Sequence, residues 1–128
     1  MRTVAIIQAR MESQRLPGKI LMDINGRPML EWVIRRALQA KKAHKVVVAT
    51  TGKFADAAII ELASRLKIPY HRGSADDVLD RFYGCARRFE ADVVVRLTGD
   101  CPLLPPGTID STIDTFEKEG VDYGRHTP

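Results

Sequence analysis

The chain has 128 residues, of which 45% are hydrophobic and 28% are charged, and its formal net charge is +4. This length suits one domain with a buried core, and the balance of apolar and charged residues excludes intrinsic disorder. No apolar stretch is long enough to cross a membrane, and the short apolar run near Met1 does not make a secretory signal peptide. We therefore expect a single domain, residues 1–128, in the cytoplasm and with no membrane partner.

The excess of positive charge favours anionic ligands. Lysine and arginine are spread through the whole chain, and no nucleic-acid-binding motif is present, so we expect no nucleic acid partner. Cys85 and Cys101 form neither a disulfide framework nor a metal-binding spacing, which predicts two reduced thiols.

Strand signals and helix signals alternate along the chain, which predicts a three-layer αβα domain with a mostly parallel sheet. Continuous apolar runs that are rich in β-branched residues predict buried strands, and apolar residues at helical spacing predict helices that pack on the sheet. Leu38 and Leu79 fall on the predicted inner faces of their helices. The predicted strands are 3–8, 45–50, 68–72 and 91–97, with a further strand beginning at 121–123, and the predicted helices are 28–38, 54–66, 75–89 and 109–116.

A cationic loop, residues 8–19, follows the first predicted strand. It contains Arg10, Arg15 and Lys19, one hydroxyl at Ser13, and a Pro-Gly pair that makes a continuous helix unfavourable. Arginine offers paired donors to phosphate oxygens and lysine offers a mobile charge, so this loop is suited to a polyphosphate. The same charges on an ordinary surface loop would serve solubility alone.

Polar residues also follow the third and fourth predicted strands. Ser74, with Asp77 three residues later, predicts a capping box that opens the helix 75–89, and this role alone would explain both residues. Asp100 follows the fourth strand, where it would make an Asx turn or hold a metal ion. Parallel strands end at one edge of a sheet, so we expect the loops after the first, third and fourth strands to converge there.

The order of these motifs resembles the signature of the sugar cytidylyltransferases, and most closely the spore-coat polysaccharide biosynthesis type. That type is related to the enzymes that make CMP-activated acidic sugars. Each block alone is weak, but six blocks in the right order cover nearly the whole chain. The blocks are A-R-x-x-S-x-R-L-P-G-K at 9–19, G-R-P-M-L at 26–30, V-A-T-T at 48–51, R-G-S at 72–74, D-V-L-D-R at 77–81 and R-L-T-G-D-C-P at 96–102.

The resemblance implies a Rossmann-like nucleotidyltransferase fold and transfer of CMP from CTP to a sugar or sugar phosphate in surface or spore-coat polysaccharide biosynthesis, with release of pyrophosphate. It implies that Asp100 holds Mg2+ and that Arg10, Lys19 and Asp100 are the catalytic residues. The residues that would bind the nucleotide are Gln8, Ala9, Arg10, Ser13, Arg15, Lys19, Arg72, Gly73, Ser74 and Thr98.

The resemblance covers about the first half of a typical family member, which continues with the sugar-binding region, a further metal-ligating carboxylate and much of the dimer contact. We therefore expect the N-terminal part of a cytidylyltransferase-like domain. The alternative is a catalytically incomplete nucleotide-binding or regulatory module, which could pair as a homodimer through an exposed sheet edge. A glycosyltransferase is a further alternative, but residues 99–101 lack its D-x-D pattern. The sequence does not identify the sugar or distinguish cytosine from other bases.

Overall fold

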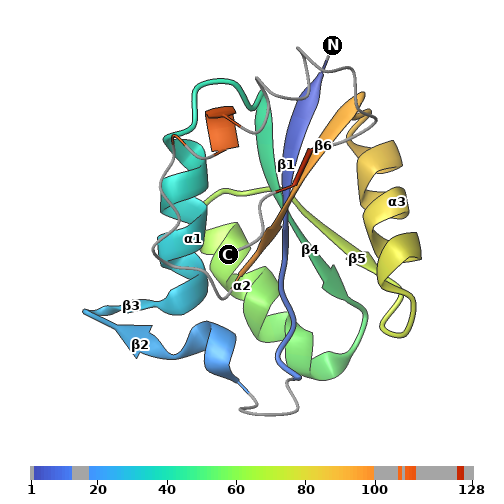
Figure 1. The fold of residues 1–128 in the computed structure, drawn as a ribbon. Helices are drawn as coiled ribbons and strands as arrows, with labels where there is room; N and C mark the ends of the chain where they lie inside the picture. Colours follow the sequence, from blue (N-terminus) through green and yellow to red (C-terminus); the bar gives the residue numbers. More distant parts are fainter. Residues whose placement is uncertain (1, 13–17, 100–106, 108, 112–123, 126–128) are drawn as a thin grey trace.

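A five-stranded parallel sheet in the order β5-β4-β1-β6-β7 forms the centre of the computed structural model (Figure 1). The chain builds the sheet from β1 outward to β4 and β5, and then returns to the other side of β1 with β6. The strand order therefore reverses between β1 and β6, which in open α/β sheets is where ligands bind. The structure describes residues 2–12, 18–99, 107, 109–111 and 124–125. The strands of the sheet are β1 (Thr3–Gln8), β4 (Lys45–Thr51), β5 (Tyr70–Gly73), β6 (Val93–Thr98) and β7 (Gly124–Arg125).

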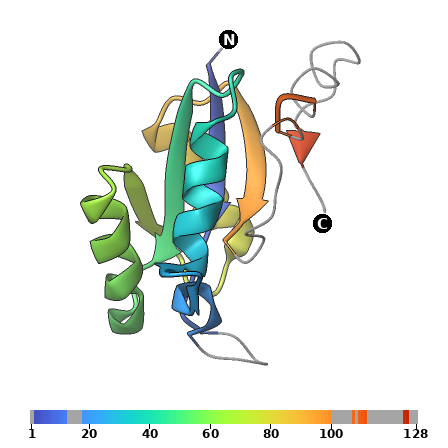
Figure 2. The same ribbon diagram turned by 90° about the vertical axis from the view of Figure 1, so that its left-hand side faces the viewer.

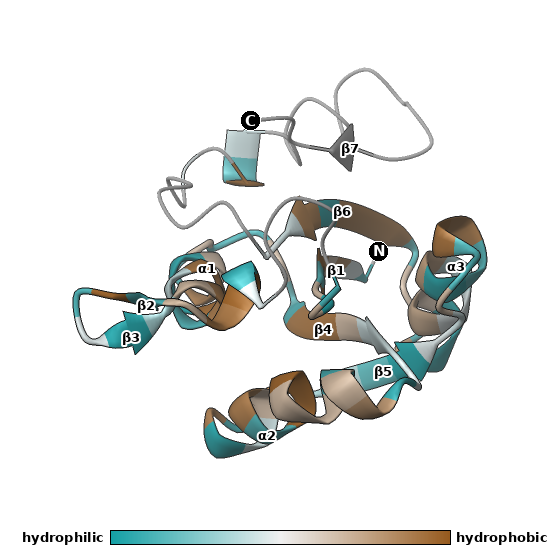
Figure 3. Ribbon diagram, turned by 90° about the horizontal axis from the view of Figure 1, so that it is seen from below, coloured by the Kyte–Doolittle hydropathy of each residue, from teal (hydrophilic) through white to brown (hydrophobic). Residues whose placement is uncertain are grey.

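Helices cover both faces of this sheet (Figure 3). α1 (Met29–Leu38) and α2 (Ala57–Arg65) lie on one face, and α3 (Val78–Arg88) lies on the other. In Figure 2, α1 lies in front of the centre of the sheet and α2 lies beside it. The predicted three-layer αβα fold with a mostly parallel sheet is therefore confirmed.

β1 is buried on both of its faces. Ala5 and Ile7 belong to the core beneath α1 and α2, whereas Val4 and Ile6 belong to the core beneath α3. Successive side chains of a strand point to opposite faces, so a strand that is covered on both faces needs a continuous apolar run. For this physical reason the predicted strand 3–8 coincides with β1.

A short hairpin projects beyond the sheet between β1 and α1. Its strands, β2 (Asp23–Ile24) and β3 (Arg27–Pro28), pair antiparallel across Asn25 and Gly26, which both have positive φ (51° and 89°). Two left-handed residues in a two-residue turn match the twist of a hairpin. The indole Nε1 of Trp32 donates to the Ile24 carbonyl at 2.6 Å and so ties the hairpin to α1.

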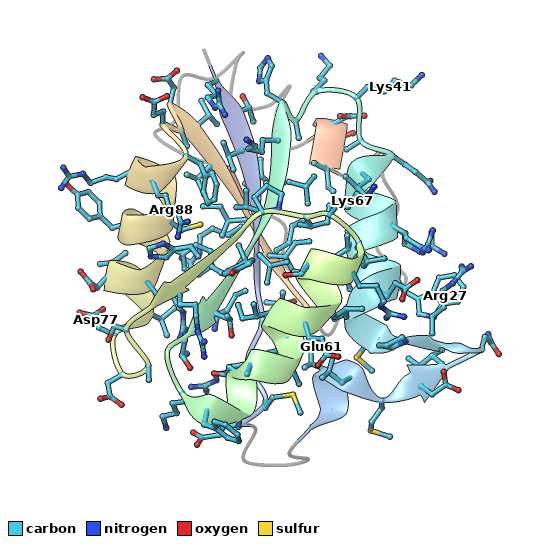
Figure 4. The ribbon with its side chains drawn as sticks, turned by 180° about the vertical axis from the view of Figure 1, so that it is seen from behind. Arg27, Lys41, Glu61, Lys67, Asp77 and Arg88 are labelled. Carbon is cyan, nitrogen blue, oxygen red and sulfur yellow. The ribbon has the colours of Figure 1, made fainter. Side chains whose placement is uncertain are left out.

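The first turn of α3 differs from the prediction, because α3 begins at Val78 and not at Ala75. The Ser74 hydroxyl accepts the Asp77 N–H at 3.0 Å, but Asp77 stays extended and caps the helix itself by accepting the Asp80 N–H at 3.0 Å. Figure 4 shows Asp77 at the start of α3. The prediction of Ser74 as the N-cap is wrong, since the local side-chain turn at Ser74 competes with helical pairing.

Smaller differences occur at other element ends. The third predicted strand begins later, as β5, and the second predicted helix begins with a 3-10 turn, η2 (Phe54–Asp56). Pro28 is the N-cap residue of α1 and not its first helical residue. The prediction that Leu38 and Leu79 lie on inner faces is wrong, since they are 53% and 74% exposed and the buried stripes of α1 and α3 consist of other residues.

Part of the last predicted helix is described. Residues 107 and 109–111 are helical, Ile109 is fully buried, and Asp110 accepts the N–H groups of the connection between α1 and β4. The rest of this helix and the predicted strand at 121–123 lie outside the described residues. Among the described helices, none combines the length and the apolar character that a membrane span requires.

Candidate functional site

The carboxyl ends of β1, β4, β5 and β6 meet at one edge of the sheet, at the bottom of Figure 1, which we call the carboxyl edge. Gln8 at the end of β1 is in register with Ala49 on one side and Thr98 on the other. The Ala9 N–H donates to the Ala49 carbonyl at 3.0 Å, and the Gly99 N–H donates to the Gln8 carbonyl at 2.9 Å. Of the predicted nucleotide contacts, Gln8, Ala9 and Thr98 therefore lie together at the point where the strand order reverses.

Gly99 allows the end of the cationic loop to pack against the end of β6. A Cβ at this position would lie 2.5 Å from Cδ1 of Ile20 and 3.0 Å from Cδ1 of Leu30, so any larger residue would force these buried side chains to shift. Ile20 is the buried residue of a 3-10 turn, η1 (Lys19–Leu21). The turn that begins with Lys19 thus packs beside Gly99, the residue that directly precedes Asp100.

The first described limb of the cationic loop is held to the rest of the molecule, and the second limb is held to the first. The Met11 N–H donates to Oδ1 of Asp56 at 2.7 Å, and the Gly18 N–H donates to the Met11 carbonyl at 2.8 Å. Nζ of Lys53 pairs with Glu12 at 2.9 Å, an interaction that raises the pKa of Lys53. These bonds close the base of the loop, and Arg10 and Lys19 stand directly beside the closure.

Arg72 holds the connection between β4 and η2. Its Nε donates to the Thr51 carbonyl at 2.9 Å and its Nη2 donates to the Lys53 carbonyl at 2.8 Å. Arg72 therefore lies at the carboxyl edge, as predicted for a nucleotide contact, but these two nitrogens are directed at backbone carbonyls. Its contact with a nucleotide stays a prediction.

Arg81, on the first turns of α3, is the residue of this region that the sequence analysis missed. It is fully buried, and its Nη1 donates to the Ser74 carbonyl at 3.0 Å. Its Nε and Nη2 are buried and have no hydrogen-bond partner in the part of the chain that the structure describes. Burial and, to a smaller extent, the Arg10 guanidinium lower the pKa of Arg81, while the Asp56 carboxylate opposes this change. A guanidinium nevertheless stays protonated near neutral pH.

A bound anion would stabilise the buried guanidinium of Arg81. Buried unpaired N–H groups are rare in folded proteins, and an uncompensated buried charge costs several kcal/mol. Gly73 makes the arrangement feasible, because a Cβ there would lie 3.0 Å from Cγ and 3.1 Å from Cα of Arg81. Arg81 could have been noticed in the sequence, since it falls beside Phe82 and one turn before Cys85 on the apolar stripe of an amphipathic helix, where an arginine is out of place.

Three predicted site residues, Ser13, Arg15 and Asp100, lie outside the described residues. Within the described ranges no cluster of three or more His, Cys, Asp or Glu side chains could hold a metal ion. Mg2+ prefers oxygen ligands and is usually bound by one or two carboxylates together with substrate phosphates, so the magnesium site stays a prediction that depends on Asp100. Asp100 follows Gly99 directly and is the carboxylate that would serve.

The described cysteine has no role at this site. Cys85 is a free thiol, fully buried on α3, and burial raises its pKa to about 12. A thiol that stays protonated at neutral pH is neither a nucleophile nor a metal ligand. The prediction that Cys85 is a reduced thiol agrees with the structure, and Cys101 lies outside the described residues.

Comparisons with known proteins point to one family. The family model described as cytidylyltransferase matches residues 4–127. The spore coat polysaccharide biosynthesis protein SpsF of Bacillus subtilis is 35% identical over 122 residues, which cover 92% of this chain and 51% of that protein.

Solved structures give the same result. A cytidylyltransferase from Leptospira borgpetersenii superposes with a TM-score of 0.88 at 37% identity, over 92% of this chain and 50% of that chain. A CMP:2-keto-3-deoxy-manno-octonic acid synthetase complexed with CTP superposes with a TM-score of 0.80 at 30% identity, over 94% of this chain and 49% of that chain. The chain thus spans about half the length of the curated relatives it matches.

Proposed function

Because the chain belongs to the cytidylyltransferase family, we propose that its carboxyl edge binds CTP and takes part in transfer of CMP to a sugar or sugar phosphate. The observation that carries this proposal is Arg81, a buried guanidinium with two unpaired nitrogens near Arg10. The related synthetase that superposes on this chain is described as complexed with CTP, which supports the same choice of nucleotide.

The triphosphate occupies the cationic loop in this proposal. Arg10 and Lys19 flank the closed base of the loop, and their charges stabilise the negative charge that develops on the departing pyrophosphate. Arg15 and Ser13 add donors from the same loop. Asp100 would hold Mg2+, which would neutralise part of the charge of the phosphates.

The nucleoside lies toward the end of β5. Gly73 and Ser74 present their backbone there, and Arg81 directs its free donors to the nucleotide. Transfer then needs no nucleophilic side chain. The acceptor oxygen of the sugar forms a bond to the α-phosphorus, and the bond from that phosphorus to the bridging oxygen breaks. Its electron pair leaves with pyrophosphate. The proton of a hydroxyl acceptor passes to water, whereas a phosphate acceptor attacks as an anion and releases no proton.

The second candidate function is nucleotide binding without transfer. The observation that favours it is the length of the match, since the chain spans about half of each relative. Both candidates predict CTP binding, and they differ in whether pyrophosphate is released when a sugar acceptor is added.

Isothermal titration with CTP and with ATP, each with and without Mg2+, tests the nucleotide site. We expect a preference for CTP, and a loss of affinity of about tenfold or more in Arg10→Ala and Arg81→Met, because each removes charged hydrogen-bond donors. Arg87→Ala, an exposed arginine at the opposite end of α3, is the matched control and should bind as the wild type does. Folded wild-type protein that binds neither nucleotide would overturn the proposal, and pyrophosphate release with a panel of acid sugars and sugar phosphates separates the two candidates.

A further inference from the structure

Asp56 is a buried carboxylate whose position suggests more than helix capping. It is 2% exposed and stands at the N-cap position of α2, yet its side chain makes no capping hydrogen bond. An aspartate at an N-cap normally stabilises its helix through such a bond. Here one oxygen accepts the Met11 N–H at 2.7 Å and the other accepts the Thr51 hydroxyl. The carboxylate therefore serves a segment 45 residues away and not its own helix.

Met11 is the point at which the two described limbs of the cationic loop meet. Its N–H is held by Asp56 and its carbonyl by the Gly18 N–H at 2.8 Å. Arg10 directly precedes Met11, and Lys19 directly follows Gly18. Fixing Met11 therefore restrains the backbone on both sides of the loop from which the cations project.

The surroundings of Asp56 connect this loop to the other strands of the site. Thr51 is the last residue of β4 and is 1% exposed, and its carbonyl accepts Nε of Arg72 at 2.9 Å. Asp56 also acts electrostatically on Arg81, to which it supplies an opposing charge. One carboxylate thus links the loop after β1, the end of β4 and the buried arginine of α3.

We infer that Asp56 is a positioning residue, which fixes Met11 and thereby sets where Arg10 and Lys19 stand relative to the phosphates of a bound nucleotide. The inference rests on the proposed function for the identity of the ligand. The restraint of the loop belongs to the chain itself and can be measured without a ligand.

The test compares Asp56→Ala, Asp56→Asn and Thr51→Val. Asp56→Ala removes both hydrogen bonds, whereas Asp56→Asn keeps an acceptor oxygen for Met11 without the charge. Thr51→Val leaves the Met11 bond in place and removes the bonds of the Thr51 hydroxyl, which donates to Asp56 and accepts the Lys53 N–H at 3.2 Å, so it is the matched control. Amide hydrogen exchange at Met11 is measured in the ligand-free proteins, and CTP affinity with Mg2+ is measured by titration calorimetry.

We expect exchange at Met11 to rise, and CTP affinity to fall, by about tenfold or more in Asp56→Ala, because a hydrogen bond to a charged group is lost. Asp56→Asn should recover most of both, and Thr51→Val should stay within about threefold of the wild type, because it leaves Met11 bound. If Asp56→Ala does not fold, Asp56→Leu takes its place, because leucine has nearly the shape of aspartate but no acceptor oxygen for the Met11 N–H, and the same rise in exchange at Met11 is expected.

Unchanged exchange at Met11 in folded Asp56→Ala would overturn the inference. It would also be overturned if Thr51→Val had the same effect as Asp56→Ala, since the carboxylate would then act through stability alone. Failure of the wild type to bind CTP would instead refute the proposed function and with it the ligand, while exchange at Met11 separately decides whether Asp56 fixes the loop.

Discussion

Replacing Arg81 by methionine should stabilise the fold while it weakens nucleotide binding. Methionine retains most of the apolar stem of the side chain and removes the buried guanidinium. In the wild type, Nε and Nη2 are buried without partners in the described part of the chain, and Nη1 makes one hydrogen bond of 3.0 Å to the Ser74 carbonyl.

The magnitude follows from these nitrogens. Each buried unsatisfied N–H group costs about 1–3 kcal/mol, whereas the lost bond from a charged donor contributes about 1.5–3 kcal/mol. The free energy of unfolding should therefore rise by about 1–3 kcal/mol in Arg81→Met, because two unsatisfied donors are removed for one hydrogen bond lost. For a chain of this size that corresponds to about 4 °C in Tm per kcal/mol.

Urea unfolding followed by circular dichroism measures this change, and CTP titration on the same preparations measures binding. The expected result is a higher midpoint with an unchanged slope, together with weaker CTP binding. A decrease of more than about 1 kcal/mol in the free energy of unfolding would refute the reasoning, because it would mean that the guanidinium is satisfied in the ligand-free protein.

Two further predictions concern packing and pH. Gly99→Ala should lower the free energy of unfolding by about 1–3 kcal/mol in a urea titration, since the added Cβ would lie 2.5 Å from Cδ1 of Ile20. Gly52→Ala is the control and should have little effect, because a Cβ there meets nothing within 4 Å. Cys85 should make the protein less stable in alkali, because burial raises the pKa of its thiol from the ordinary 9.0 to about 12. The contribution of this thiol to the free energy of unfolding is complete below pH 9 and is lost as the pH rises toward 12. Cys85→Ala should flatten this part of the stability profile, and an equal slope in both proteins would contradict the assignment.

The fold was predictable because its two central strands, β1 and β4, are buried on both faces. Both contain continuous apolar runs, and such runs leave little choice of partner surface, whereas β6 alternates between buried and half-buried residues. The start of α3 was not predictable from propensity, because Ser74 and Asp77 are both good caps and the choice between them depends on tertiary contacts. Arg81 makes one of these contacts, with the Ser74 carbonyl.

The site was predictable in part for the same kind of reason. Gln8, Ala9 and Thr98 follow from topology, since parallel strands bring their ends to one edge. Asp56 has no local signal: it lies between apolar helix residues, and its partner Met11 is 45 residues away. Arg81 had a signal in its place on an apolar stripe, but periodicity alone does not say whether a buried arginine is paired.

The charges of Asp56 and Arg81 should be energetically coupled across the carboxyl edge, and a double-mutant cycle tests this coupling. Asp56→Asn alone removes an opposing charge from a buried guanidinium, so it should lower the free energy of unfolding. In the Arg81→Met background the same change removes a buried carboxylate that has lost its opposing charge, so it should be close to neutral or stabilising. The coupling energy should reach about 0.5–3 kcal/mol by urea unfolding of the four proteins, and additivity within about 0.5 kcal/mol would show that the two residues act independently. A bound nucleotide supplies the negative charge that the free protein lacks at Arg81, so CTP should raise the stability of the wild type more than that of Arg81→Met.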